Sequence, residues 1–177
     1  KVGNKVVSKQ DEMIVLAVNK PRGIVCTEER RERDSIVRFL NYPVRVTYIG
    51  RLDKDSHGLL LMTNNGDIIN KIMRAANKHE KEYKVTVDKE ITEDFLKKMA
   101  AGVPILDTVT RPCTVKKIGK YTFSIILTQG LNRQIRRMCE ALGYEVKDLL
   151  RVRVMNITLD GLKDGQYRKL TDQELNE

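Results

Sequence analysis

Short apolar runs separated by turn-forming residues constrain the fold of this chain more than any other feature of its sequence. Residues 13–18 form one such run, which predicts a buried strand, and Pro21 and Gly23 end it. Around Tyr83, apolar and polar residues alternate with the period of a half-buried strand. Because several neighbouring strands have short connections, most of them must pair antiparallel. The sequence therefore predicts an α+β fold, with one large, mostly antiparallel mixed sheet and flanking helices.

Periodicity and capping residues also predict the order of the elements. Strands are expected at residues 13–18, 44–49, 59–63, 83–87, 103–115, 121–128, 149–159 and about 166–170. Helices are expected at residues 36–40, after the turn at 64–67, from the N-cap Thr92 to about Gly102, and from about Asn132 to Gly143. Thr171 and Glu174 have the spacing of a capping box.

The charge balance indicates a polyanionic partner. The chain has 177 residues and a formal net charge of +9, and no apolar run is long enough to span a membrane. Excess positive charge without a membrane segment favours RNA or DNA as the partner. Since the first residue is Lys1 rather than methionine, we expect the chain to be part of a longer protein.

Metal and cofactor sites are not expected. Cys26, Cys113 and Cys139 lie far apart, and neither they nor His57 and His79 have the spacing of metal ligands. We interpret the cysteines as reduced thiols, with Cys139 in the core. The glycine-rich motifs that bind nucleotide phosphates do not occur. The predicted chemistry therefore uses no metal, nucleotide or redox cofactor.

The first candidate functional segment is residues 50–58, a polar loop between two glycines. Asp53 lies there beside Arg51 and Lys54, and cations in this position lower the pKa of a carboxyl group and keep it ionised. An ionised carboxylate can act as a nucleophile or a base. Two other interpretations remain open: a solvated surface loop with ion pairs, and a nuclease in which Asp53 and Asp55 hold a divalent metal ion.

The second segment is residues 79–84. Lys81 and Tyr83 are two positions apart on a predicted strand, so their side chains share one face. An aromatic ring beside a cation on a pocket wall would suit a flipped base. The alternative is an amphipathic edge strand with Tyr83 in the core.

The third segment is residues 128–138, which lead into a predicted helix. Arg133, Arg136 and Arg137 share the side opposite its apolar stripe and lie near its N-terminus. The helix dipole disfavours cations there by roughly 0.3–1 kcal/mol each. Arginines placed against that field indicate an anionic partner, either a phosphate or a carboxylate, although simple exposure to solvent would also account for one or two of them.

Four segments, in order along the chain, resemble the pseudouridine synthases that modify ribosomal RNA. They are residues 19–23, 50–53, 81–83 and 130–137. The resemblance implies that Asp53 is the catalytic aspartate, that Tyr83 stacks on the target base, and that Arg136 pairs with the aspartate. At position 133 many relatives carry other residues, which predicts a different local contact with the substrate.

The resemblance is closest to the branch that modifies 23S ribosomal RNA. It implies isomerisation of a specific uridine to pseudouridine by base flipping, without a cofactor, in bacteria, with a tRNA as an additional target. The reduced cysteines predict a cytoplasmic protein, and we expect a monomer because nothing in the sequence indicates an obligate interface. Arg51 is expected to replace the flipped nucleotide in the RNA stack. The expected phosphate contacts are Lys20, Arg22, Lys81, Arg133 and Arg137.

The resemblance also implies a domain organisation. Residues 1–12 are expected to be the remnant of a linker from a missing N-terminal S4-like RNA-binding domain, and residues 13–177 to be the catalytic domain. The main alternative function is a non-catalytic RNA-binding module of ribosome assembly, which explains the charge but not the position of Asp53 among cations.

Overall fold

The computed structural model describes residues 14–27, 34–128, 131, 133–159 and 161–170. Its strands are β1 Val15–Lys20, β2 Thr47–Ile49, β3 His57–Thr63, β4 Lys81–Val87, β5 Pro104–Ile105, β6 Thr108–Val109, β7 Thr114–Lys117, β8 Thr122–Leu127, β9 Val146–Val154, β10 Ile157–Thr158 and β11 Tyr167–Lys169. Its helices are α1 Ile36–Leu40, α2 Gly66–Lys78, α3 Glu93–Ala101 and α4 Gln134–Ala141. The predicted capping box at Thr171 lies outside the described residues.

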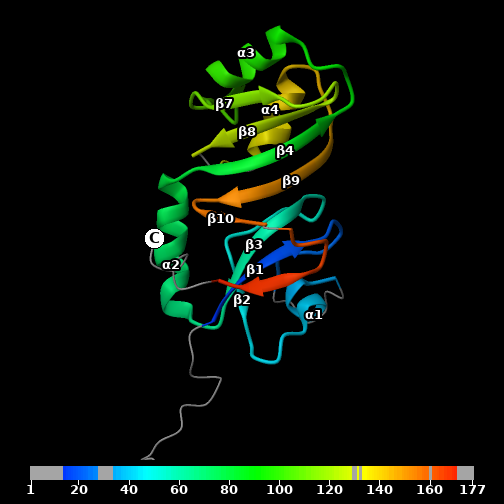
Figure 1. Ribbon diagram of the computed structural model, residues 1–177. Helices are drawn as coiled ribbons and strands as arrows, with labels where there is room; N and C mark the ends of the chain where they lie inside the picture. Colours follow the sequence, from blue (N-terminus) through cyan, green and yellow to red (C-terminus); the bar gives the residue numbers. More distant parts are fainter. Residues whose placement is uncertain (1–13, 28–33, 129–130, 132, 160, 171–177) are drawn as a thin grey trace, which may run out of the picture.

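One nine-stranded sheet runs through the molecule (Figure 1). Its strand order is β11-β1-β3-β9-β4-β8-β7, with β2 paired to β3 and β10 paired to β9. Among the described strands of this sheet, only β3 and β9 pair in parallel. The predicted α+β class, with a mostly antiparallel mixed sheet and flanking helices, is confirmed.

Helices cover the sheet on both faces because side chains alternate along each strand. Leu16 and Val18 of β1 pack with α1, whereas Val15 and Ala17 of the same strand lie in a second cluster against which α2 packs. A third cluster joins α3 and α4 to β4, β8 and β9. The loop after β2 leads into β3, whose first residues pair with β9.

Gly58 allows the parallel pair of β3 and β9 to form. Its φ is +117°, and a Cβ atom added there would lie 2.2 Å from the backbone oxygen of Arg151. Both the conformation and the close approach therefore require glycine. This contact brings the start of β3 against the middle of β9 and fixes the backbone that carries Arg151.

Replacing Gly58 with Ala is expected to lower the free energy of unfolding by at least about 3 kcal/mol, because β3 and β9 must separate. At roughly 2–4 °C per kcal/mol, a thermal melt will detect the loss. Gly66→Ala is the control, since nothing lies within 4 Å of a Cβ there and its φ is ordinary. A Gly58→Ala protein with the same melting temperature as the wild type would contradict the close approach of Gly58 to the backbone of Arg151.

Two predicted strands differ from the structure. The expected strand at 103–115 is instead the hairpin β5–β6 followed by β7, because Leu106 and Asp107 take left-handed φ values of 46° and 62° and reverse the chain. The expected strand at 149–159 divides into β9 and β10 at Met155, whose φ is 54°. Local alternation does not reveal such turns when no glycine occupies them.

Other predictions are confirmed. Helix α1 spans the predicted residues, and Thr92 caps α3 by accepting a hydrogen bond from the Phe95 N–H at 3.1 Å. Cys139 is fully buried. In the part of the chain that the structure describes, no helix has the length and apolar character needed to cross a membrane.

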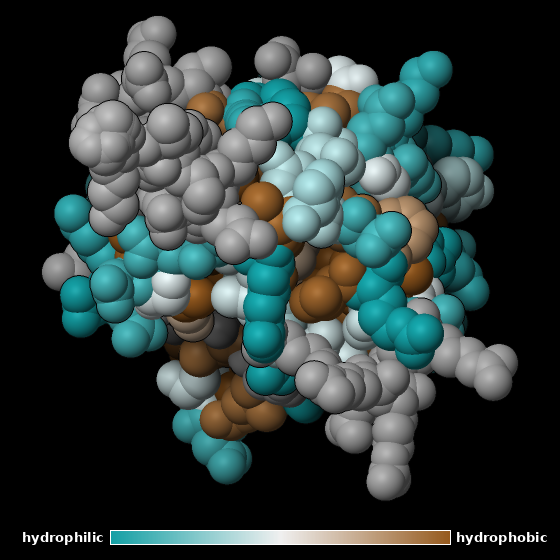
Figure 2. All heavy atoms as spheres, turned by 90° about the horizontal axis from the view of Figure 1, so that it is seen from below, coloured by the Kyte–Doolittle hydropathy of each residue, from teal (hydrophilic) through white to brown (hydrophobic). Residues whose placement is uncertain are grey.

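Viewed from below, the surface shows hydrophilic residues with apolar ones exposed between them (Figure 2). Phe39 of α1 and Tyr167 of β11 are among the large apolar side chains that remain exposed. The Tyr167 ring meets the Tyr42 ring edge-on, with the centroids 5.4 Å apart. Isolated exposed apolar residues of this kind are common on folded proteins.

Candidate active site

The loop between β2 and β3 presents Asp53 on a fixed backbone. Gly50 begins the loop with a φ of +73°, and the Ser56 N–H donates to the Asp53 carbonyl at 3.0 Å. Leu52 is buried, and its N–H donates to the Cys26 Sγ atom at 3.5 Å. The buried neighbour anchors the loop, while the Asp53 side chain remains 39% exposed. The carboxylate is therefore accessible although its backbone is held in place.

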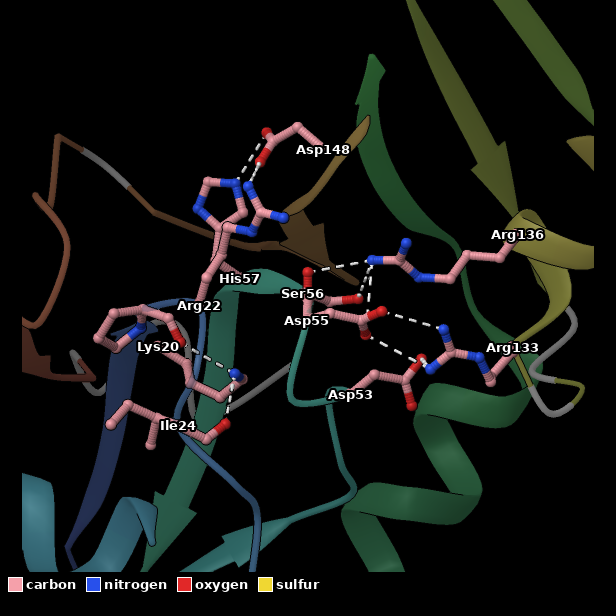
Figure 3. A network of polar contacts seen from close by, with 11 residues as sticks. Lys20, Arg22, Ile24, Asp53, Asp55, Ser56, His57, Arg133, Arg136 and Asp148 are labelled. Carbon is pink, nitrogen blue, oxygen red and sulfur yellow. Dashed lines mark hydrogen bonds and ion pairs between the residues drawn. The ribbon is translucent and has the colours of Figure 1, made fainter. Parts of the chain in front are cut away.

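Arg133 joins the two aspartates of this loop (Figure 3). Its guanidinium lies 3.3 Å from Asp53 Oδ2 and 3.0 Å from Asp55 Oδ2. Burial raises the pKa of Asp55, but the hydrogen bond from Arg133 and the charges of Arg136 and Arg133 outweigh it and hold the pKa below its usual value. The loop therefore carries at least one carboxylate that remains ionised at neutral pH.

Arg136 anchors the same loop through the backbone of Asp55 and the side chain of Ser56. It donates to the Asp55 carbonyl at 3.1 Å and to Ser56 Oγ at 3.2 Å (Figure 3). Its distance to the Asp55 carboxylate is 3.6 Å, and its side chain is only 11% exposed. The structure thus assigns the ion pair with Asp53 to Arg133 and not, as the resemblance implied, to Arg136. The reason is local: Arg133 occupies the N-cap of α4 in a left-handed conformation, with φ 47°, and lies closer to the loop.

Lys20 does not lie on the surface where a phosphate contact was predicted. It is fully buried, and its Nζ donates to the carbonyls of Pro21 at 3.0 Å and Ile24 at 2.7 Å (Figure 3). Burial lowers the pKa of its ammonium group. The turn that Lys20 holds also supports the loop that carries Asp53, because the Gly23 N–H donates to the Lys54 carbonyl at 2.7 Å. Lys20 is therefore a structural residue beneath the loop.

Lys20→Met is expected to lower the free energy of unfolding by about 2 kcal/mol, because two partly buried carbonyls lose a charged donor. Urea titration will measure the change. Lys71→Met, at an exposed position of α2, is the matched control and should be neutral. If Lys20→Met is as stable as the wild type but binds RNA more weakly, Lys20 contacts a phosphate, as the sequence predicted, and has no structural role.

A pocket of about 450 Å³ opens beside the loop. Its lining includes, from several elements, Arg51, Asp53, Ser56, Met73, Lys81, Tyr83, Arg133, Gln134 and Arg151, together with apolar side chains. This volume is within the usual range for a small-molecule site, and its mixture of apolar walls and a few polar groups is typical of one.

Strand β4 supplies one wall of this pocket. Lys81 and Tyr83 both line it, which confirms that they share a strand face. Tyr83 is half-buried and pairs across the sheet with Ile125 of β8 and Arg151 of β9. Lys81 is only 7% exposed, so it lies within the pocket wall rather than on the outer surface.

Of the remaining predicted RNA contacts, Arg51 lines the pocket, whereas Arg22 and Arg137 do not. Arg51 is exposed at its edge, with its guanidinium carbon 5.8 Å from the centre of the Tyr48 ring. Arg22 is 54% exposed and lies 3.6 Å from Asp148, which also binds His57 at 2.9 Å (Figure 3). Arg137 is half-buried on α4.

The sequence interpretation missed Arg151. It is 8% exposed, lines the pocket, and donates through Nε to the Leu59 carbonyl at 2.8 Å. The available signal was an arginine within the alternating run of β9, at a position that faces inward. Within the described residues, no group of three or more His, Cys, Asp or Glu side chains is arranged to hold a metal ion.

A loop carboxylate paired with arginine, beside a pocket walled by a strand tyrosine, agrees with the family comparison. The sequence matches the family model described as RNA pseudouridylate synthase over residues 14–141, a span that includes Asp53, Tyr83 and Arg136. The chain belongs to the RNA pseudouridylate synthase family.

Individual relatives agree with this assignment. The chain is 58% identical over 177 residues to the dual-specificity RNA pseudouridine synthase RluF of Escherichia coli (strain K12), covering 99% of this chain and 61% of that protein. It is 35% identical over 180 residues to the ribosomal large subunit pseudouridine synthase B of Bacillus subtilis (strain 168), covering 97% and 74%. A solved crystal structure of a pseudouridylate synthase superimposes with a TM-score of 0.84 at 28% identity, covering 96% of this chain and 75% of the other. The predicted resemblance is confirmed, and the chain spans 61% of the length of RluF.

Proposed function

We propose that this protein isomerises a specific uridine of 23S ribosomal RNA to pseudouridine without a cofactor, and that it also accepts a tRNA. The position of Asp53 carries the proposal: Arg133 holds this carboxylate at a pocket whose wall presents Tyr83. Family membership supports the class of reaction. The names of the two relatives support an RNA of the large ribosomal subunit and a second RNA substrate.

The reaction breaks the N1–C1′ bond, rotates the uracil and joins C5 to C1′, so it involves neither hydrolysis nor net oxidation. Asp53 adds to the base, adds to the sugar or removes a sugar proton, and the ion pair with Arg133 favours its reactive, ionised form. Tyr83 stacks on the flipped uracil and assists loss of the C5 proton. Arg136 positions the loop through Asp55 and Ser56.

Four arginines are the proposed RNA contacts, two of which, Arg51 and Arg133, line the pocket. Arg51 is placed to enter the RNA stack where the target nucleotide leaves it, and Arg22, Arg133 and Arg137 are placed to meet phosphates. Lys20 and Lys81 are withdrawn from this set because they are buried.

RNA affinity is expected to fall steeply as salt rises, since phosphate contacts release counterions. In Arg22→Gln the slope of log affinity against log salt should be smaller by about one. Lys98→Gln is the control: this lysine is also exposed and pairs with an aspartate, at 3.0 Å, but it lies on α3. Arg22, in contrast, lies in the turn whose Gly23 N–H donates to the Lys54 carbonyl of the Asp53 loop. Equal slopes for Arg22→Gln and the wild type, measured by fluorescence anisotropy, would remove Arg22 from the contacts.

We further propose that residues 13–177 form the catalytic domain and that residues 1–12 connect it to an S4-like RNA-binding domain, with the enzyme acting as a cytoplasmic monomer. The family resemblance supports this organisation.

The proposed function is tested by incubating transcripts of 23S RNA and of tRNA with the protein, both as this chain and at full length. Reverse-transcription stops after carbodiimide treatment then locate any pseudouridine. A modified uridine in 23S RNA supports the proposal and names the target. RNA that is bound but unmodified by both forms would favour the non-catalytic assembly module, and RNA cleavage that requires a divalent ion would favour the nuclease.

A further inference from the structure

His57 begins β3 directly after the loop that carries Asp53, and it takes no part in the proposed reaction. Its Nε2 atom lies 2.9 Å from Asp148 Oδ2 on β9, within hydrogen-bond distance. The other oxygen of the same carboxylate, Oδ1, lies 3.6 Å from the guanidinium of Arg22 (Figure 3). Asp148 therefore joins a histidine to an arginine that the proposed function assigns to RNA.

The three side chains of this cluster differ in their exposure to solvent. The His57 side chain is 15% exposed, that of Asp148 is 36% exposed and that of Arg22 is 54% exposed. The histidine is thus largely shielded from direct contact with RNA, whereas the arginine is open to it. An effect of His57 on RNA binding must pass mainly through Asp148.

The second ring nitrogen of His57 also faces an acid. Its Nδ1 atom lies 3.8 Å from Asp164 Oδ1, in the segment before β11, and has no hydrogen-bond partner within the described residues. A carboxylate only accepts, so in the neutral ring the bond to Asp148 places the proton on Nε2 and leaves a lone pair on Nδ1. The protonated ring donates from both nitrogens and carries a positive charge between the two carboxylates. The charge state of His57 therefore decides whether Asp148 is neutralised.

Arg22 and His57 are the cations that share Asp148 in the part of the chain that the structure describes. The other charged groups on elements next to His57 bind partners of their own: Lys20 of β1, Arg151 of β9, Arg136 of α4, and Asp53 and Asp55 of the preceding loop. A change in the charge of His57 therefore alters the negative charge that Arg22 faces.

We propose that His57 is a positioning residue whose protonation releases Arg22 to the RNA. The inference rests on the proposed function, which makes Arg22 a phosphate contact. When the ring is neutral, Asp148 keeps its full negative charge and competes with RNA phosphates for the arginine. When the ring takes up a proton, it neutralises the carboxylate and leaves the guanidinium free to bind a phosphate. RNA affinity therefore increases as pH falls.

The test is a titration of RNA with the full-length protein at fixed ionic strength, from about pH 8 to about pH 5.5, within the range in which histidines change charge. The wild-type dissociation constant should fall about twofold to fivefold toward the lower pH, the scale of one exposed ion pair. His57→Gln keeps a donor for Asp148 but cannot be protonated, so it should remove this dependence. His79→Gln replaces the other histidine of this chain, which is exposed, and as the matched control should retain the dependence.

Two further variants show whether the effect passes through Asp148 and Arg22, and they also serve if His57→Gln does not fold. Asp148→Asn removes the competing charge, so its affinity at pH 8 should reach that of the wild type at low pH and change little with pH. Glu145→Gln is its control, because this exposed acid next to β9 pairs with Lys147, at 3.4 Å, and its loss should leave the pH dependence unchanged. Arg22→Gln should lose both affinity and pH dependence.

A wild-type dissociation constant that does not change with pH would overturn the proposal, as would the wild-type dependence in His57→Gln or in Asp148→Asn. The same dependence in Arg22→Gln would also overturn it, because His57 would then act on the RNA without the arginine. These comparisons require a wild type that binds RNA. A full-length wild type that binds neither 23S RNA nor tRNA at any pH would instead refute the proposed function, so the two failures are distinguishable.

Discussion

Asp53→Asn is expected to lower the rate of pseudouridine formation by about 10⁴-fold or more, the scale of loss when a group that reacts with substrate is removed. The amide has the shape of the carboxylate but can neither add to the nucleoside nor accept its proton. RNA binding should stay within about threefold, because Arg133 keeps its 3.0 Å ion pair with Asp55 and the loop backbone keeps its anchors. Single-turnover assays and a binding titration with the same RNA measure both effects.

Asp55→Asn is the matched control for this variant. It makes the same change in the same loop, beside the same arginine, and should cost far less rate because Asp55 does not line the pocket. Equal losses of rate in the two variants would mean that the rate depends on the total charge of the loop and not on Asp53 in particular. Equal losses that a divalent ion reverses would favour the metal-bound pair of aspartates.

Replacing Arg133 or Arg136 with Gln is expected to have different effects on stability and on the rate of pseudouridine formation. Arg136 is 11% exposed and holds the backbone of Asp55 and the hydroxyl of Ser56, so its loss should lower the free energy of unfolding by about 2–3 kcal/mol and reduce the rate as the loop shifts. The ion pair between Arg133 and Asp53 is more than one-third exposed on both sides, and such pairs contribute at most about 1 kcal/mol. Arg133→Gln should therefore lose rate with little loss of stability.

Paired melts and rate measurements distinguish these two arginines. At roughly 2–4 °C per kcal/mol, Arg136→Gln should melt clearly below Arg133→Gln. The reverse order, or a wild-type rate in Arg133→Gln, would return the ion pair with the catalytic carboxylate to Arg136. That result would agree with the resemblance and contradict the ion pair that Arg133 forms with Asp53 in the structure.

The sequence predicted those parts of the site that depend on order along the chain. The loop around Asp53 and the common face of Lys81 and Tyr83 follow from local periodicity and turn residues. Arg133, expected inside a helix that begins at about residue 132, is instead the N-cap of α4. The strand periods also placed β1 and β3 in the core, where residues on alternate sides pack with α1 and α2.

Features set by contacts between distant segments could not be predicted in this way. Arg133 reaches Asp53 because it adopts a left-handed conformation, which few residues other than glycine take and which composition does not reveal. Lys20 turns back onto its own loop and is buried, although beside a proline and an arginine it resembled a surface cation. Arg151 enters the pocket because β9 pairs with β3 in parallel, a pairing that joins residues far apart in the sequence.

The most direct test of the central claim is release of tritium from RNA labelled at C5 of uridine, in EDTA, by the full-length wild type and by its Asp53→Asn variant. Forming the C5–C1′ bond expels that hydrogen, so the measurement reports the isomerisation itself. We predict one equivalent released per modified uridine by the wild type, unaffected by the chelator, and none above background by Asp53→Asn. Release at equal rates from both proteins, or from neither while both bind the RNA, would contradict the assignment of Asp53 as the catalytic carboxylate of this pocket.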